Sequence, residues 1–141
     1  MTEREREDRL RRWFAMWLNQ TDAGMESLFA PDALYIESWG PEYHGLPAIR
    51  HWFSEWNRRG RVVTWEIRQF FHKGEQTVVE WYFQNAMDDG RVEEFDGLSL
   101  VRWNGDGQIA RLQEFGCNLD RYDPYAHGPE PRFRDEAVRW F

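Results

Sequence analysis

The chain has 141 residues, which is the usual size of a single domain. Apolar residues make up 41% of it and aromatic residues 17%, so it is too rich in large rings to remain disordered. Its 18 Lys and Arg against 25 Asp and Glu give a formal net charge of −7. A nucleic-acid-binding surface needs a basic stripe, and we therefore expect a globular domain with no nucleic-acid partner.

The N-terminal residues and the cysteine content bear on location. Residues 1–12 are nearly all charged, unlike a signal peptide, and the longest apolar run, residues 13–18, is far short of the ~20 residues that span a bilayer. The single cysteine, Cys117, cannot form an internal disulfide, which favours a reducing compartment. We expect a cytoplasmic protein without membrane association.

Helical spacing dominates the first sixty residues. A first helix is predicted by one apolar stripe: Leu10, Trp13, Phe14, Trp17 and Leu18. Thr21 or Asp22 is expected to cap a second, short helix that Pro31 ends. After a predicted strand over residues 33–39 and a Gly/Pro loop, the pattern indicates a third helix from Pro47 until Gly60.

From residue 61 onward the pattern is that of strands. Segments rich in β-branched and aromatic residues are separated by Lys73-Gly74, Asp89-Gly90 and residues 104–107, which are strong hairpin signals. The sequence thus predicts a four-stranded antiparallel meander with these strands: residues 62–72, 76–87, 91–103 and 108–118.

The last residues differ in composition from the rest. Residues 122–132 hold three of the six prolines and are expected to run extended. Phe133, Ala137 and Phe141 then have helical spacing, which predicts a short terminal helix. We expect it to dock on its own body, over a cavity or onto a second subunit.

Helices followed by a meander indicate an α+β fold. We expect a cone-shaped roll, in which the N-terminal helices pack on one face of a strongly curved antiparallel sheet that encloses an interior. The predicted domain covers residues 1–118, and residues 119–141 form a Pro-rich tail.

This order of elements resembles the nuclear transport factor 2-like superfamily over residues 8–118. The motifs that carry the resemblance are Leu28-Phe29-Ala30, Ala48-Ile49-Arg50 and Gly107-Gln108-Ile109 at their present spacings. Glu-Ser-Trp-Gly, Glu-Trp-Tyr-Phe and Glu-Phe-Gly-Cys segments make the chain most similar to SnoaL-like bacterial proteins. The superfamily contains ketosteroid isomerases, polyketide cyclases, dehydratases and non-catalytic members, so the resemblance implies a fold rather than a reaction.

Comparison with the ketosteroid isomerases assigns one catalytic position. Their base is a carboxylate near the end of the first strand, where this chain has Glu37. Their Tyr and Asp oxyanion donors are replaced by Phe14 and Ser99. Steroid isomerisation is therefore not expected.

The same comparison suggests which strand residues face the interior. If Ser99 points inward, the resemblance implies that Glu114 does too, together with Glu80 and Tyr82 on the preceding strand. With Tyr35, Glu37 and Trp39 they would wall an aromatic pocket that holds three carboxylates. The alternative phase instead buries these residues: Val79, Trp81, Phe83, Leu98 and Leu100.

Each of the three candidate catalytic residues has a catalytic interpretation and a purely structural one. Glu37 is a general base whose pKa is raised by burial, or a carboxylate bonded to a loop amide or an arginine. Glu114, like Glu80, is a pocket acid or a solvated strand residue; two acids close together would form an acid/base pair. His44, on the loop near the mouth, exchanges protons or is simply exposed.

The nine tryptophans divide between packing and binding. Trp39 is expected to contact the ligand, since its strand carries it toward the mouth with Glu37. The helical tryptophans are expected mainly in the core, with Trp56 also placed at the ligand. Trp65 or Trp81 is expected on the outer sheet face, at a homodimer surface.

Two functions remain open. One is an enzyme without metal or cofactor, since no ligand cluster or nucleotide motif occurs: Glu37 removes a proton next to a carbonyl, and Ser99, Tyr82 or His44 hydrogen-bonds the oxyanion. Isomerisation, cyclisation or dehydration would suit it. The other is a non-catalytic domain that binds a ligand or a protein. In both, the expected partners are a small apolar or aromatic molecule and a second copy of the chain.

Overall fold

The structure, a computed structural model, describes residues 1–134. Its three helices are α1 (Glu3–Asn19), α2 (Met25–Leu28) and α3 (Leu46–Asn57). Its strands are β1 (Phe29–Ile36), β2 (Glu42–His44), β3 (Gly60–Lys73), β4 (Gln76–Met87), β5 (Val92–Trp103) and β6 (Ile109–Asn118). None of the helices in this part of the chain is long and apolar enough to cross a membrane.

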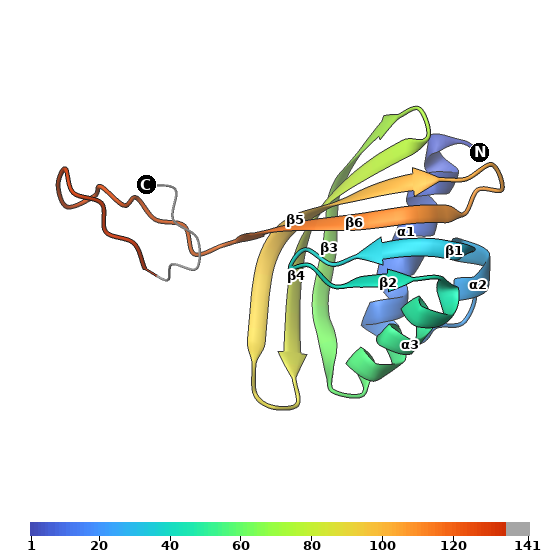
Figure 1. Cartoon of the computed structure of the whole chain (residues 1–141), viewed down its shortest axis with the longest axis horizontal. Coiled ribbons are helices and arrows are strands. Elements are labelled where there is room, and N and C mark those ends of the chain that lie inside the picture. Colours follow the sequence, from blue (N-terminus) through green and yellow to red (C-terminus); the bar gives the residue numbers. More distant parts are fainter. Residues whose placement is uncertain (135–141) are drawn as a thin grey trace.

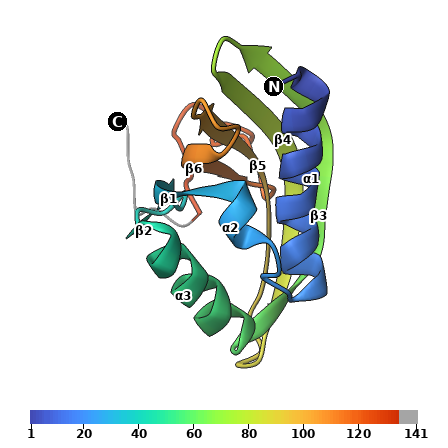
Figure 2. The same ribbon diagram turned by 90° about the vertical axis from the view of Figure 1, so that its right-hand side faces the viewer.

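All the strands of residues 1–134 form one sheet in the order β2-β1-β6-β5-β4-β3. Neighbouring strands are antiparallel except β1 and β6, which run parallel. The sheet curves strongly without closing, and the helices lie on its concave side (Figures 1 and 2). The α+β fold, with helices packed on a curved antiparallel sheet, is thus confirmed.

Helix α1 forms because its ends are capped and one face is apolar. Thr2 and Glu5 make a capping box, and Gln20 ends the helix in the left-handed conformation. The apolar face buries Trp13 completely. The Trp13 ring meets Phe29 at 4.7 Å and Tyr35 at 5.7 Å between centroids, so it lies at the junction of helix and sheet.

The region between α1 and α3 differs from the prediction in three details. Gly24, not Thr21 or Asp22, precedes α2, and no side chain caps that helix. Strand β1 begins earlier than expected and ends at Ile36, because residues 37–40 form a turn in which the Gly40 amide donates to the Glu37 carbonyl. The short strand β2 was expected as loop, since three residues between Pro41 and Gly45 carry too little pattern.

The predicted strand phase is wrong for β4. Directly opposed residues in antiparallel strands share a face. Ser99 lies opposite Glu114 on β6, as predicted, but opposite Val79 on β4. Glu80 and Tyr82 therefore point away from the interior, because the larger gain comes from burying the β4 residues of the alternative phase: Val79, Trp81 and Phe83. The alternative phase does not hold on β5, where Leu98 is 41% exposed.

The expected place of two tryptophans is also corrected. Trp65 and Trp81 are 7% and 1% exposed and pack in the core on the inner face of the sheet, not on its outer face. The Trp81 indole N–H donates to the Ser99 hydroxyl oxygen at 2.9 Å, so this tryptophan has a buried partner for its only polar atom.

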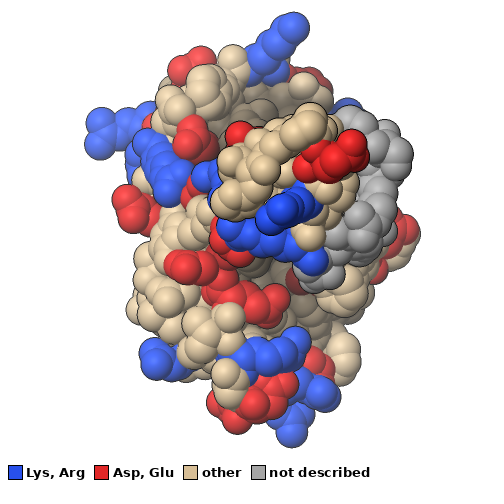
Figure 3. Space-filling view, turned by 90° about the vertical axis from the view of Figure 1, so that its left-hand side faces the viewer, with Lys and Arg blue, Asp and Glu red and all other residues tan. Residues whose placement is uncertain are grey.

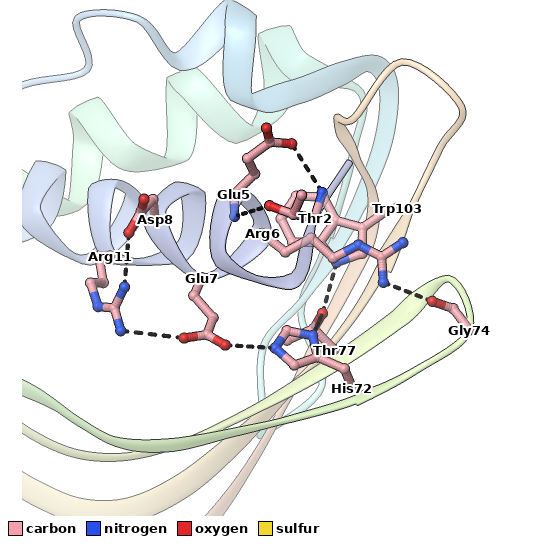
Figure 4. Close-up of polar contacts among 10 residues, drawn as sticks. All are labelled: Thr2, Glu5, Arg6, Glu7, Asp8, Arg11, His72, Gly74, Thr77 and Trp103. Atoms are coloured by element: carbon pink, nitrogen blue, oxygen red, sulfur yellow. Dashed lines mark hydrogen bonds and ion pairs between the residues drawn. The ribbon is translucent and has the colours of Figure 1, made fainter.

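A polar network ties α1 to the β3–β4 hairpin (Figure 4). The imidazole of His72 lies 2.9 Å from Glu7 Oε2 through Nε2 and 2.9 Å from Thr77 Oγ1 through Nδ1. Thr77 is fully buried and also accepts the indole N–H of Trp103 at 2.9 Å. His72 thus satisfies a partly buried carboxylate and a buried hydroxyl at once.

His72→Leu is expected to lower the free energy of unfolding by about 1–3 kcal/mol, because it leaves Glu7 and Thr77 without this partner. Urea denaturation measures the change. His44→Leu is the matched control, since the side chain of His44 is 72% exposed and its ring bonds to the exposed Glu42. Equal stability of the two variants would show that the His72 network does not stabilise the fold.

The tail turns back on itself instead of running extended. The Asp123 carboxylate accepts the Tyr125 amide at 2.8 Å, and the Arg132 amide donates to the Pro124 carbonyl at 2.8 Å. Asp123 thus starts a turn. The sequence prediction missed it because the three prolines indicated an extended segment. The described part of the tail projects beyond the end of β6 (Figure 1). The predicted terminal helix, except Phe133, lies outside the described residues.

Candidate functional site

A cavity of about 810 Å³ lies between the helices and the concave face of the sheet. Every major element contributes a wall residue: Trp17 from α1, Tyr35 from β1, Trp52 and Trp56 from α3, Trp65 from β3, Phe83 from β4, Phe95 from β5 and Glu114 from β6. Aromatic rings therefore form a large part of the wall, as expected for a site that takes an apolar ligand.

The structure brings together only some of the predicted site residues. Those that line the cavity are Tyr35, Glu37, Trp39, Trp56 and Glu114. Trp39 stands at its edge and is 78% exposed. The two predicted carboxylates nearest the ends of β1 and β6 therefore share one cavity.

The other predicted residues lie elsewhere. His44 is exposed on the edge strand β2 and contacts Glu42. Glu80 and Tyr82 lie on the outer face, where they contact Gln69 and Glu94 respectively. Ser99 faces inward but is fully buried behind the wall, where its oxygen accepts the Trp81 N–H.

Sequence reasoning missed Tyr43, which is the nearest polar partner of Glu37. Tyr43 lies on β2 opposite Tyr35, and its hydroxyl donates to Glu37 Oε2 at 2.8 Å. Its ring stacks on Trp52, with centroids 4.5 Å apart and planes 13° apart. The only sequence signal for Tyr43 was an aromatic residue shortly after the predicted strand. Because β2 was expected as loop, the sequence did not indicate that Tyr43 would pair with β1 and reach Glu37.

Glu37 is held where β1 gives way to the turn. Burial raises the pKa of its carboxyl group, and the hydrogen bond from Tyr43 offsets part of this. Burial and the neighbouring Glu37 also raise the pKa of Tyr43, so its hydroxyl remains protonated and keeps donating. No ion pair joins Glu37 to a basic side chain within residues 1–134.

Glu114 lies deeper, enclosed by protein on most sides yet still in contact with the cavity. Burial and the negative charge of Glu37 raise its pKa to about 8, while the Tyr35 hydroxyl offsets a small part. Near neutral pH, Glu114 is therefore mostly protonated. The same burial, with the charge of Glu114, raises the pKa of Tyr35 well above its usual value.

The two acids thus form a pair in which one member holds a proton. When carboxyl groups lie close together, ionisation of the first disfavours ionisation of the second. A site of this kind contains a hydrogen-bond donor, Glu114, and a proton acceptor, Glu37, in one aromatic enclosure.

The basic side chains that line the cavity lie at its exposed opening. Arg59 and Arg91 line the cavity edge, with side chains 74% and 64% exposed, and pair with Glu55 and Asp89 at 3.1 and 2.9 Å. On the face from which the tail projects, basic side chains alternate with acidic ones (Figure 3). Within residues 1–134, no group of three or more His, Cys, Asp or Glu is placed to hold a metal ion.

The comparisons with known proteins identify the family. Residues 10–112 match the SnoaL-like domain. The chain belongs to the SnoaL-like family. No curated protein matches it.

Solved structures share the fold of this SnoaL-like chain at low sequence identity. A protein of ketosteroid isomerase-like fold from Catenulispora acidiphila, in complex with trimethylamine, is 19% identical with a TM-score of 0.68, over 79% of this chain and 85% of that one. A candidate isomerase from Bacillus subtilis is 15% identical with a TM-score of 0.72, over 83% and 90%. A candidate SnoaL-like polyketide cyclase from Mesorhizobium loti is 21% identical with a TM-score of 0.66, over 82% and 99%.

Proposed function

We propose that the cavity binds a small, largely apolar molecule and that Glu37 acts on it as a general base. The observation that carries this proposal is the pair of carboxyl groups, Glu37 and Glu114, in one aromatic cavity with their pKa values raised to different extents. Such a pair is suited to proton transfer at a carbon next to a carbonyl group.

In the proposed step, a proton leaves the substrate carbon for the Glu37 carboxylate. The electron pair of the broken C–H bond moves into the enolate, whose oxygen accepts a hydrogen bond from protonated Glu114. Glu37 then returns the proton to the same or another carbon. Glu114 thereby takes the role that the sequence had offered to Ser99, Tyr82 or His44, none of which lines the cavity.

A solved structure of the same fold also supports a small-molecule site. The relative from Catenulispora acidiphila is in complex with trimethylamine, so this fold can hold a small organic molecule.

Proton abstraction is tested with indan-2-one, a planar ketone with acidic α-hydrogens. Deuterium uptake at its α-carbons in D₂O, followed by NMR, is expected to exceed the buffer rate with the wild-type protein. Glu37→Gln is expected to lower the protein-catalysed rate by about 10²-fold or more, because the base is lost. Glu75→Gln, on the exposed β3–β4 turn, is the matched control and should leave the rate unchanged.

Binding of indan-2-one without any rate above buffer, or equal rates for the wild type and Glu37→Gln, would overturn the catalytic proposal. The second candidate function, ligand binding without chemistry, would then stand. One observation favours it: Phe14 and Ser99, at the isomerases' donor positions, are both packed in the core, with Phe14 stacked on Trp65 at 3.8 Å.

We also infer a homodimer through the outer sheet face. Leu98 and Phe115 lie opposite each other on β5 and β6 and are 41% and 48% exposed, which is an apolar pair typical of an interface. A dimer mass in sedimentation would support it, and a monomer would contradict it.

We also propose that the protein is cytoplasmic. The free thiol of Cys117 is exposed, which supports a reducing compartment.

A further inference from the structure

We propose that Tyr43 is the positioning residue of the Glu37 base: its hydroxyl holds one carboxylate oxygen, so that the other is aimed at the ligand. This inference rests on the proposed function, since it assigns the residue that makes the same base effective. Tyr43 does not take the substrate proton itself and acts only through Glu37.

The pairing of β1 with β2 places Tyr43 beside Glu37. Tyr43 lies directly opposite Tyr35, and opposed residues of antiparallel strands share a face, so both rings lie on the inner side of the sheet. The Glu37 amide donates to the Pro41 carbonyl at 2.8 Å, which extends this ladder by one residue pair. Glu37 and Tyr43 are thus diagonal neighbours across the hairpin, a distance that a tyrosine side chain spans.

The hydroxyl is held in place because the ring that carries it is fixed. Helix α3 follows β2 after a single residue, and its Trp52 stacks on Tyr43 with centroids 4.5 Å apart. Trp52 in turn lies 4.8 Å from Tyr35 and 5.0 Å from Trp17. A ring packed on this layer has little freedom to turn, so its hydroxyl keeps the 2.8 Å hydrogen bond to Glu37 at little further cost in side-chain entropy.

Glu37 needs such a partner because of its own position. It is the first residue after β1, in the turn that ends at Gly40, and its long side chain has several rotatable bonds. A general base acts only when its oxygen lies within about 3 Å of the proton that it takes. With Oε2 bound to Tyr43, rotation of the carboxylate is restrained, and Oε1 is left to receive the substrate proton.

The same hydrogen bond has a measurable electrostatic effect. Tyr43 stabilises the ionised carboxylate and so lowers the pKa of Glu37 against the rise that burial causes. Removing the Tyr43 hydroxyl should therefore raise the Glu37 pKa. The other titratable groups that line the cavity around Glu37 are these: Tyr35 on β1, Glu114 and Cys117 on β6, Glu55 on α3, Glu93 on β5, and Arg59 and Arg91 on the loops.

The test is Tyr43→Phe, which removes the hydroxyl and keeps the ring that stacks on Trp52. For indan-2-one exchange in D₂O, kcat is expected to fall about ten-fold with KM nearly unchanged, because the rings that bind the ketone remain. The acid limb of the kcat–pH profile, which Glu37 governs, should move up by about one pH unit. The limb at about pH 8, which Glu114 governs, should stay in place.

The fall in kcat separates positioning from basicity. A raised pKa alone makes Glu37 a stronger base and would hold or increase kcat above the acid limb. An NMR titration of the Glu37 carboxyl carbon measures its pKa without turnover and shows that the variant is folded; the pKa should rise by about one unit in Tyr43→Phe.

Tyr82→Phe is the matched control. The Tyr82 hydroxyl also donates to a glutamate, Glu94, at 2.6 Å, but on the outer face of the sheet. Its removal should leave kcat, KM, the pH profile and the Glu37 pKa as in the wild type.

A Tyr43→Phe protein with the kcat of the wild type would overturn the positioning role, whether or not its acid limb moves. An unchanged Glu37 pKa in the NMR titration would also overturn it, because the hydroxyl would then not hold the carboxylate. The two proposals fail in different ways. A wild-type protein without exchange above buffer removes the base itself, whereas wild-type exchange that Tyr43→Phe fully retains removes only the role of Tyr43.

Discussion

Glu114→Gln is expected to stabilise the protein by about 2–4 kcal/mol at pH 9 and to change its stability little near pH 4. Burial and the charge of Glu37 raise the Glu114 pKa to about 8 in the folded protein, against an ordinary value of 4.5. Between these values the folded state keeps a proton that the unfolded state has released. The wild-type free energy of unfolding therefore falls as pH rises from about 4.5 to about 8.

The size of this change in the free energy of unfolding follows from the same difference in pKa between the folded and unfolded states. Each pH unit between the two pKa values corresponds to about 1.4 kcal/mol, and water that reaches the cavity weakens the effect, so the full span of about 5 kcal/mol is reduced. Glutamine is neutral at every pH and carries no such loss. Urea denaturation of the wild type and Glu114→Gln across this pH range measures the difference.

Two further variants make the result specific. Glu75→Gln should follow the wild-type curve at every pH, since its side chain is exposed on a turn. Glu37→Gln removes the charge that disfavours ionisation of Glu114, so the pH-dependent loss should become smaller. A Glu114→Gln stability change that is the same at pH 4 and pH 9 would contradict a buried, protonated Glu114.

Most of the fold was predictable because its signals are local. The helical stripe of α1, the third helix opened by Pro47 and the Gly-containing hairpin turns each lie within one short segment. The boundaries of β1 and the existence of β2 were not predictable, since they depend on pairing with strands far along the chain. The parallel contact between β1 and β6, for example, joins residues 34–36 to residues 111–113.

The candidate site was harder to predict because it depends on which face each strand presents. The comparison placed Ser99 and Glu114 on the correct face but put Glu80 and Tyr82 beside them, and the β4–β5 register reverses this. Tryptophans decide that register, since burying Trp81 outweighs burying a carboxylate. The coupling between Glu37 and Glu114 needs the parallel β1–β6 register, in which Ile36 lies opposite Gln113, and no local pattern encodes that pairing.

Gly97→Ala is expected to lower the free energy of unfolding by about 3 kcal/mol or more, which makes it the most damaging single-methyl change considered. Gly97 lies directly opposite Trp81 on β4, and an added Cβ would overlap the six-membered ring of that indole. The ring cannot move aside, because it is buried, donates to Ser99, and lies 5.7 Å from both Trp65 and Phe95. Overpacking of a rigid aromatic core costs about 1–3 kcal/mol and occasionally more.

The same substitution is expected to impair ligand binding, since Trp65 and Phe95, the rings in contact with Trp81, form part of the cavity wall. Urea denaturation measures the change in the free energy of unfolding, and titration calorimetry with indan-2-one measures the change in ligand affinity. Gly105→Ala is the matched control: an added Cβ there meets no atom within 4 Å, so its stability should stay near that of the wild type. Shortening the indole in a Trp81→Leu background should reduce the cost of Gly97→Ala, because the atoms that clash are gone. If Gly97→Ala proves as harmless as Gly105→Ala, Trp81 does not lie across Gly97, and the inner wall that shapes the cavity on β4 and β5 is differently built.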